Sequence, residues 1–321
     1  MSTTSPPVPR ISAIEAAQAA MGHTRRTLFP IRLKRWIILG FLAFLDQCGR
    51  TLSGGAGGGD GSGHVGDWPG GGRSVGEEVA DAVNTASAWL AAHAVEVGIG
   101  VFVGVILIGL LVALVLWINA RGTFMYLDGV ASGRTDIGRA WRQHAAAADS
   151  YFRWRLAIAL LMIVVVLFAA GLAAVVLVAF ARGRLEGVAV PIVLAALLPV
   201  FAVLLLALPA LVLAGVALRD FVAPLQLMSG QACGSAAQVL EGLVTANPGA
   251  FIVYLLIKLL AVALTGVVVF VGGCLTCCLG FLPVVMHTLF QPLFFFERSF
   301  SVFLLKQMGH DLPARLGARE L

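Results

Sequence analysis

The chain has 321 residues, of which 59% are hydrophobic and only 12% are charged, and its formal net charge is +5. Soluble domains carry roughly 25% charged residues, so this composition excludes a water-soluble globule held by a short anchor. The excess of Arg and Lys does not indicate a nucleic-acid partner. These residues sit beside apolar segments, where membrane orientation and lipid phosphates account for them.

The first 35 residues contain six basic side chains. No small-residue cleavage site follows the short apolar run at residues 36–45, so we expect residues 1–35 to be retained as an N-terminal segment at the cytoplasmic interface. The run itself has only ten uncharged residues, a length more typical of a re-entrant or buried segment.

Charge favours a crossing in this region. The positive-inside rule places both the N-terminal basic cluster and the six arginines of residues 119–155 in the cytoplasm. Both demands are met only if residues 36–52 cross the membrane. Asp46 is then expected at the outer interface.

Five longer apolar runs follow, and as helices they are long enough to span a hydrocarbon layer ~30 Å thick. They lack the alternation of barrel strands, so helices are the structure that satisfies their backbone groups. The runs cover residues 97–118, 156–181, 188–218, 250–271 and 279–296. We therefore predict an all-α, polytopic bundle of six transmembrane helices over residues 36–310, with interfacial cytoplasmic helices. Both termini are expected in the cytoplasm, including a short tail at residues 311–321.

An outer region is expected at residues 49–96, between the first two crossings. Its glycine-rich part, residues 53–76, has the composition of a flexible linker. Residues 75–96 place apolar side chains at three- and four-residue steps opposite acidic ones, which predicts an amphipathic helix. This helix would run into the next crossing and offer a surface to another membrane or periplasmic protein.

Two motifs in the glycine-rich part match soluble enzymes but lack their context. Residues 72–76 fit a nucleophile elbow and residues 61–66 fit a dinucleotide fingerprint. Both motifs require a preceding β-strand, and glycine-rich sequence stands there instead. We predict no catalytic residue, no enzymatic activity and no cofactor.

An Arg followed 11 or 12 residues later by a Gly recurs after the second, fourth and sixth expected crossings. The three copies are Arg121 with Gly133, Arg219 with Gly230, and Arg298 with Gly309. Each copy would place Arg at a helix exit, followed by a short amphipathic segment. The chain therefore reads as hairpins in parallel orientation, a pattern found in transporters and in other membrane proteins.

Three features carry a family resemblance. They are Phe29-Pro30 ahead of Trp36, the block from Arg121 to Asp128, and Cys274-Leu-Thr-Cys-Cys278 followed by Phe295-Phe-Glu-Arg298. With them, residues 14–312 outside the glycine-rich insert resemble an uncharacterised bacterial multi-pass membrane family of unknown function. More distantly, the layout is similar to the membrane portion of some glycerophosphodiester phosphodiesterases. The resemblance implies six helices in a bacterial inner membrane and supplies no active site, and no phosphodiesterase catalytic domain is present.

Lys258 is the one basic residue well inside an expected span. An ammonium at the bilayer centre costs on the order of 2.5–3.5 kcal/mol, so such residues are functional candidates. His287 and Gln291 are expected at a similar depth on the neighbouring span. Two interpretations stay open: the three side chains share an intramembrane polar site, or Lys258 snorkels inward while the other two join helices.

The cluster Cys274, Cys277 and Cys278 falls at the expected outer turn between the last two spans. Three interpretations stay open: inert thiols, a structural disulfide, or metal and redox chemistry. A closed zinc site requires four ligands, and no His or Asp lies nearby in the sequence, so no metal site is predicted.

Anionic lipid headgroups at the cytoplasmic face are the expected partners of the basic segment 121–155. The predicted contacts are Arg121, Arg139, Arg142, Arg153 and Arg155. The leading functional hypothesis is a non-enzymatic scaffold or accessory subunit that binds lipid or protein. The alternative is a transporter or channel for a small solute or lipid, which would use the polar site on the last two spans.

Overall fold

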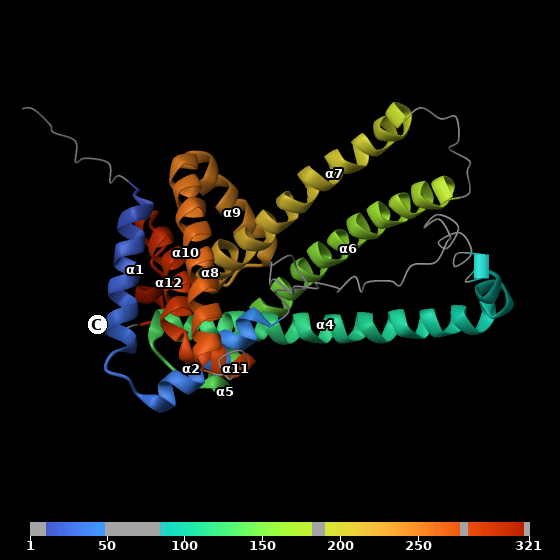
Figure 1. The fold of residues 1–321 in the computed structure, drawn as a ribbon. Coiled ribbons are helices and arrows are strands. Elements are labelled where there is room, and N and C mark those ends of the chain that lie inside the picture. Colours follow the sequence, from blue (N-terminus) through green and yellow to red (C-terminus); the bar gives the residue numbers. More distant parts are fainter. Residues whose placement is uncertain (1–10, 49–83, 86, 182–189, 277–281, 318–321) are drawn as a thin grey trace, which may run out of the picture. The chain divides into compact units, whose positions relative to one another are not determined.

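The computed structural model describes residues 11–48, 84–85, 87–181, 190–276 and 282–317. Its regular elements over these residues are helices (Figure 1). In chain order they are α1 (Ala13–Leu28), α2 (Leu33–Gln47), α4 (Ala94–Ser132), α5 (Ile137–Gln143), α6 (Ala145–Ala181), α7 (Val190–Ala217), η2 (Leu218–Val222), α8 (Ala223–Ser229), α9 (Cys233–Ala246), α10 (Pro248–Leu275), α11 (Pro283–Leu289), α12 (Gln291–Gln307) and α13 (Leu312–Arg315).

The chain divides into two compact units. Unit 1 comprises Met1–Gly49, Val115–Leu156 and Ala214–Leu321, and unit 2 comprises Arg50–Leu114 and Ala157–Leu213. The boundaries fall within α4, α6 and α7, so each of these helices contributes residues to both units. The buried polar residues discussed below all belong to unit 1.

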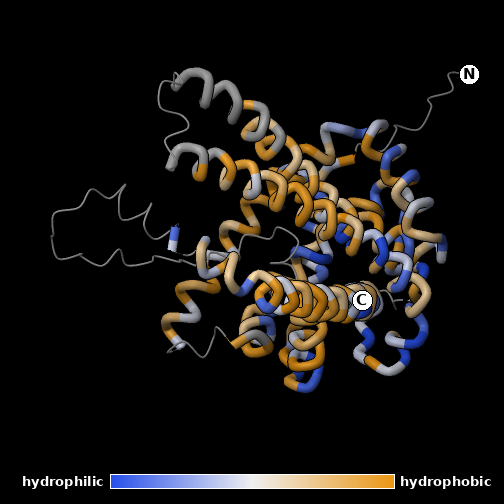
Figure 2. Tube along the Cα trace, turned by 90° about the vertical axis from the view of Figure 1, so that its right-hand side faces the viewer, coloured by the Kyte–Doolittle hydropathy of each residue, from blue (hydrophilic) through white to orange (hydrophobic). Residues whose placement is uncertain are grey.

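Four helical stretches of the described chain are long and apolar enough to cross a membrane. They are Ala94–Ser132, Ala145–Val175, Leu204–Ser229 and Pro248–Leu275. The hydrophobic colour follows most of the helical trace in Figure 2, and many hydrophilic residues lie near helix ends and connections. The all-α fold expected from the sequence is confirmed, and four of the six expected crossings have helices that qualify.

The first and sixth expected crossings correspond to shorter helices. Helix α2 has 15 residues, and the segment 279–296 contains the seven-residue α11, a break at Phe290 and the start of α12. Helices α2 and α11 pack together, and Gly40 approaches Thr288 so closely that a side chain at position 40 would clash. Helix length alone therefore does not establish a count of six.

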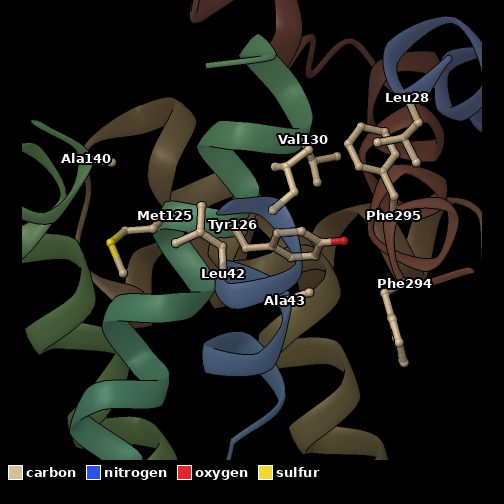
Figure 3. Close-up of a cluster of buried hydrophobic side chains, with 10 residues drawn as sticks. Leu28, Leu42, Ala43, Met125, Tyr126, Val130, Ala140, Phe294 and Phe295 are labelled. Carbon is tan, nitrogen blue, oxygen red and sulfur yellow. The ribbon is translucent and has the colours of Figure 1, made fainter. Parts of the chain in front are cut away.

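Helix α12 is central to unit 1, where it contacts α1, α2, η2, α10 and α11. A hydrophobic cluster joins it to the N-terminal helices and to α4 (Figure 3). In Figure 3, Tyr126 of α4 lies beside Leu42 and Ala43 of α2, with its hydroxyl directed toward the side where Phe294 and Phe295 of α12 lie. The N-terminal and C-terminal helices thus share one core.

The repeated glycines lie at helix ends: Gly133 and Gly230 directly follow α4 and α8, and Gly309 follows the α12 cap residue Met308. Gly133, Gly230 and Gly309 have φ angles of +70°, +69° and +89°. A left-handed residue after the last helical turn ends a helix at low cost only when it is glycine. The repeat found in the sequence is therefore a repeated helix stop.

The expected outer region lies mostly outside the described residues, including all of residues 53–76. Of the expected amphipathic helix at 75–96, residues 87–92 are helical, and a turn at His93 separates them from α4. The described part of this segment therefore does not continue into α4 without a break.

His23 of α1 is held in the packing between α1, α4 and α12. Its Nε2 lies 2.9 Å from the carbonyl oxygen of Val130, and its ring stacks on Phe295 with 5.5 Å between centroids. Burial, aided by the positive charges of Arg26 and Arg35, lowers the pKa of His23 below 6.5. The folded state therefore holds this ring neutral, as a donor to the Val130 carbonyl.

The protein should lose stability as the pH falls below 6.5. In that range the unfolded chain binds a proton at His23 that the folded chain excludes, so acid favours unfolding. His23→Gln, which keeps a donor near Val130, should flatten this part of the curve, as followed by unfolding in detergent between pH 7 and 5. His310→Gln is the matched control. An unchanged slope in His23→Gln would contradict the prediction.

Candidate functional site

Six charged side chains meet in the interior of unit 1. Three are carboxylates and three are cations, and each is at most 9% exposed. They are Asp46 on α2, Arg219 and Asp220 on η2, Lys258 on α10, and Glu297 and Arg298 on α12. We call this set the charge network.

Arg219 links α2 to α12. Its Nε and one terminal nitrogen donate to Oδ2 of Asp46 at 3.2 and 2.5 Å. The other terminal nitrogen donates to Oε1 of Glu297 at 3.0 Å. A planar guanidinium can serve two carboxylates in this way, whereas an ammonium has no such fixed fork.

Lys258 links α10 to the same cluster. Its ammonium donates to Oδ2 of Asp220 and, at 3.0 Å, to Oε1 of Glu297. The hydroxyl of Tyr254, one turn earlier on α10, also donates to Oδ2 of Asp220, at 2.9 Å. Asp220 therefore accepts from two donors on one helix.

Arg298 is fully buried and holds the backbone of η2. One terminal nitrogen donates to the carbonyl oxygen of Arg219 at 2.5 Å and lies 3.7 Å from Oδ1 of Asp220. Its Nε and second terminal nitrogen are buried without a hydrogen-bond partner among the described residues. The carboxylate of Asp220 is therefore the main group that offsets its positive charge.

The backbone of η2 positions the middle of the network. Residues 218–222 form a turn of π-helix between α7 and α8, and all five are buried. Such turns inside helices are rare and occur frequently at functional sites. Here the turn lets the consecutive residues Arg219 and Asp220 both serve the network, one toward Asp46 and the other toward Lys258.

The network balances its own charge, with three positive and three negative groups. In an apolar interior an unpaired charge destabilises the folded state, whereas paired and hydrogen-bonded charges are tolerated. Each member has an oppositely charged member within 4 Å. The arrangement can fasten four helical segments together, and it can also hold protons or charge in a low-dielectric setting.

The structure places the three residues of the predicted polar site as follows. Lys258 is 6% exposed and bonds to Asp220 and Glu297. Gln291 donates to the Tyr126 hydroxyl at 3.1 Å, and the buried ring of His287 stacks on Phe294 with 4.6 Å between centroids. The hydrogen bonds of Lys258 thus involve carboxylates that the sequence analysis did not name, and a site shared by Lys258, His287 and Gln291 stays a prediction.

The five arginines predicted to contact lipid differ in exposure. Arg121 is 9% exposed and contacts the rings of both Trp117 and Trp141, which also contact each other, and it forms a 2.8 Å ion pair with Asp149. Arg155 is also buried. The side chain of Arg139 is 40% exposed, and Arg142 and Arg153 are exposed. The proposed headgroup contacts are therefore kept for Arg139, Arg142 and Arg153.

The cysteine cluster lies largely outside the described residues, because Cys277 and Cys278 are not among them. Among the described cysteines, Cys48, Cys233 and Cys274 form no disulfide with one another, and Cys274 is exposed. Within the described chain, no group of three or more His, Cys, Asp or Glu side chains is placed to hold a metal ion.

Asp46 was expected at the outer interface. In the structure it is 2% exposed, its carboxylate pairs with Arg219, and its backbone carbonyl accepts from the Asn119 side chain at 2.6 Å. Its placement at the outer interface stays a prediction. The sequence analysis did not name Asp220 and Glu297 as site residues, although each is adjacent in sequence to an arginine of the repeat. Because a buried arginine requires a carboxylate partner, this adjacency could have indicated them.

A family described as "Family of unknown function (DUF7544)" matches residues 11–310. The chain belongs to this family. The match includes every member of the charge network, so the network lies within the DUF7544 region. No curated protein and no solved structure is significantly similar to this DUF7544 chain.

Breaking the Asp46–Arg219 pair should destabilise the DUF7544 fold more than removing both members. Asp46→Leu leaves a buried guanidinium without its main partner and should cost about 3–5 kcal/mol. Asp46→Leu combined with Arg219→Met removes one charge of each sign and should recover most of that loss. Unfolding by denaturant in detergent measures both.

Lys306→Met is the matched control, because it breaks the exposed 3.0 Å pair between Lys306 and Asp311. Exposed pairs contribute ~0–1 kcal/mol, so this variant should unfold much like the parent. The proposed role of the network in holding the helices together would be contradicted by either of two results. One is a loss of unfolding free energy in Asp46→Leu as small as that in Lys306→Met. The other is a loss in the double variant equal to the sum of the losses in the two single variants.

Proposed function

We propose that this protein is a non-enzymatic integral membrane scaffold or accessory subunit. The observation that carries the proposal is the self-contained charge balance of the network. Its six groups satisfy one another across α2, η2, α10 and α12, as expected of a structural lock between helices. The partners proposed for the scaffold are anionic lipid at the cytoplasmic face and a protein that binds through residues 75–96.

The lipid partner is supported by the basic surface around α5 and the start of α6. Arg142 and Arg153 are exposed, and the exposed indole of Trp154 lies beside Arg153 in sequence. Aromatic and basic side chains together are typical of the headgroup level of a membrane, where each cation contributes ~1 kcal/mol near an anionic surface.

The proposed topology places both termini in the cytoplasm of a bacterial inner membrane. Helix α1 packs along α12, and the backbone N–H of Ser12 donates to the Gln307 side chain at 2.8 Å. This packing supports an even number of crossings, because helices that share a core outside the spans lie on one side of a membrane. Six crossings require α2 and the segment around α11 to cross despite their shortness.

Reporter fusions test this topology. A fusion after Leu321 should report the cytoplasm, and a fusion within residues 53–76 should report the outer compartment. The reason is that six crossings are the arrangement that places both basic clusters inside. A cytoplasmic signal from residues 53–76 would show that α2 does not cross, and an outer signal from the C-terminus would overturn the cytoplasmic placement of the termini.

A transporter or channel is the second candidate, and two observations favour it. The π-helical turn η2 and the break at Phe290 are irregular backbone next to buried charges. Transporters build substrate and ion sites at interrupted helices of this kind. Lys258, with Asp220 and Glu297, would then be the groups that change protonation or partner during transport.

Flux measurements on the full chain in proteoliposomes separate the two candidates. Under a proton or small-ion gradient, a scaffold should give no flux above that of empty liposomes. The control for a charge-network effect is Lys306→Met, which changes an exposed lysine instead. Flux that is present in the parent and in Lys306→Met but absent in Lys258→Met would replace the scaffold proposal with the transporter.

A further inference from the structure

A second charged site lies away from the charge network, where α2 begins and α4 ends. A surface pocket of about 430 Å³ opens there. It is lined by Lys34 and Ile38 of α2, by Gly133, Arg134, Thr135 and Asp136 of the α4–α5 connection, and by Arg139 of α5. All of these residues belong to unit 1.

The lining carries more positive than negative charge. Lys34 and Arg134 are exposed, and among the described residues no carboxylate lies within ion-pair distance of either. Arg139 lies 3.6 Å from the buried Asp128. The one lining carboxylate, Asp136, already accepts the backbone N–H of Arg139 at 3.1 Å. Lys34 and Arg134, which have no carboxylate partner among the described residues, therefore face a common space with Arg139, whose partner Asp128 lies 3.6 Å away.

Arg35 adds a fourth cation at the edge of this pocket. A Cβ at position 133 would lie 2.9 Å from a terminal nitrogen of Arg35, so the glycine allows the guanidinium to rest against the backbone. The φ of +70° at Gly133 requires glycine for a second reason. The Nε of Arg35 is buried without a hydrogen-bond partner in the described structure.

An apolar stripe runs along α2 next to the pocket. Leu33, Ile37 and Phe41 follow at four-residue steps and are 70%, 48% and 38% exposed. On a helix this stripe is adjacent to the one formed by Lys34 and Ile38, which line the pocket. A ligand with an anionic head and an apolar chain would fit both surfaces, whereas a free phosphate would use only the first.

We infer that this pocket binds the phosphate of an anionic phospholipid, with the acyl chains against the exposed stripe of α2. The inference rests on the proposed function, since it specifies where the lipid partner binds. Lys34, Arg134 and Arg139 hold the phosphate oxygens, as basic pockets do for lipid headgroups. Arg142 lies on α5 but outside the lining, so it takes no part in this site.

The test uses the purified full-length chain and dioctanoyl phosphatidylglycerol as the probe. Dioctanoyl phosphatidylcholine, glycerol phosphate and inorganic phosphate are the comparison ligands. The anionic lipid should bind most tightly, and Lys34→Gln and Arg134→Gln should each weaken it about fivefold. Arg25→Gln removes the same charge from an exposed position on α1, away from the pocket lining, and should stay within about twofold of the parent. Lys34 and Arg134 are exposed, so neither change should disturb folding.

Each of the other outcomes refutes the pocket as a lipid site, and one of them also refutes the lipid partner. An equal loss in Arg25→Gln would refute the pocket and leave a diffuse basic surface, in keeping with the proposed lipid partner. Equal binding of the two lipids by the parent would refute both the pocket and that partner. Glycerol phosphate or inorganic phosphate binding as tightly as the anionic lipid would show that the pocket serves a soluble phosphate.

Discussion

Unit 1 depends on the guanidinium of Arg219, which is shared between Asp46 and Glu297. A cation in this position is tolerable only while both carboxylates are present, because the apolar surroundings solvate it poorly. Glu297 in turn accepts from Lys258, and Lys258 from α10 also holds Asp220. The segments that carry the network must therefore assemble together, since removal of one segment leaves buried charges on the others without an oppositely charged partner.

The repeated arginines show how one local pattern acquires different tertiary roles. Arg219 and Arg298 join the charge network, whereas Arg121 contacts two tryptophans and pairs with Asp149. The helix stop that follows each of them keeps its left-handed glycine. The left-handed glycine is thus common to all three copies, while the local helix geometry at the arginine and its partner differ from one copy to the next.

The candidate site was foreseen only through its cations. Lys258 stood out because an ammonium within an apolar run of the sequence is unusual, and the two arginines stood out because they recur. The carboxylates were less visible, since Asp46, Asp220 and Glu297 lie at the ends of apolar runs, where acidic residues are ordinary. His287 and Gln291 were matched to Lys258 by depth, yet the depth of a residue does not specify its direction around the helix axis.

Hydropathy was sufficient to predict the all-helical class, because long apolar runs without the alternation of barrel strands satisfy their backbone in lipid as helices. The helix ends could also be predicted from the sequence, since a left-handed residue after a helix is usually glycine. The pairing of charges was decided by the tertiary structure. Arg219 lies 173 residues from Asp46 and 78 from Glu297, and Lys258 lies 38 residues from Asp220. No local pattern encodes such distances, because they depend on the packing of α2, α10 and α12 around η2.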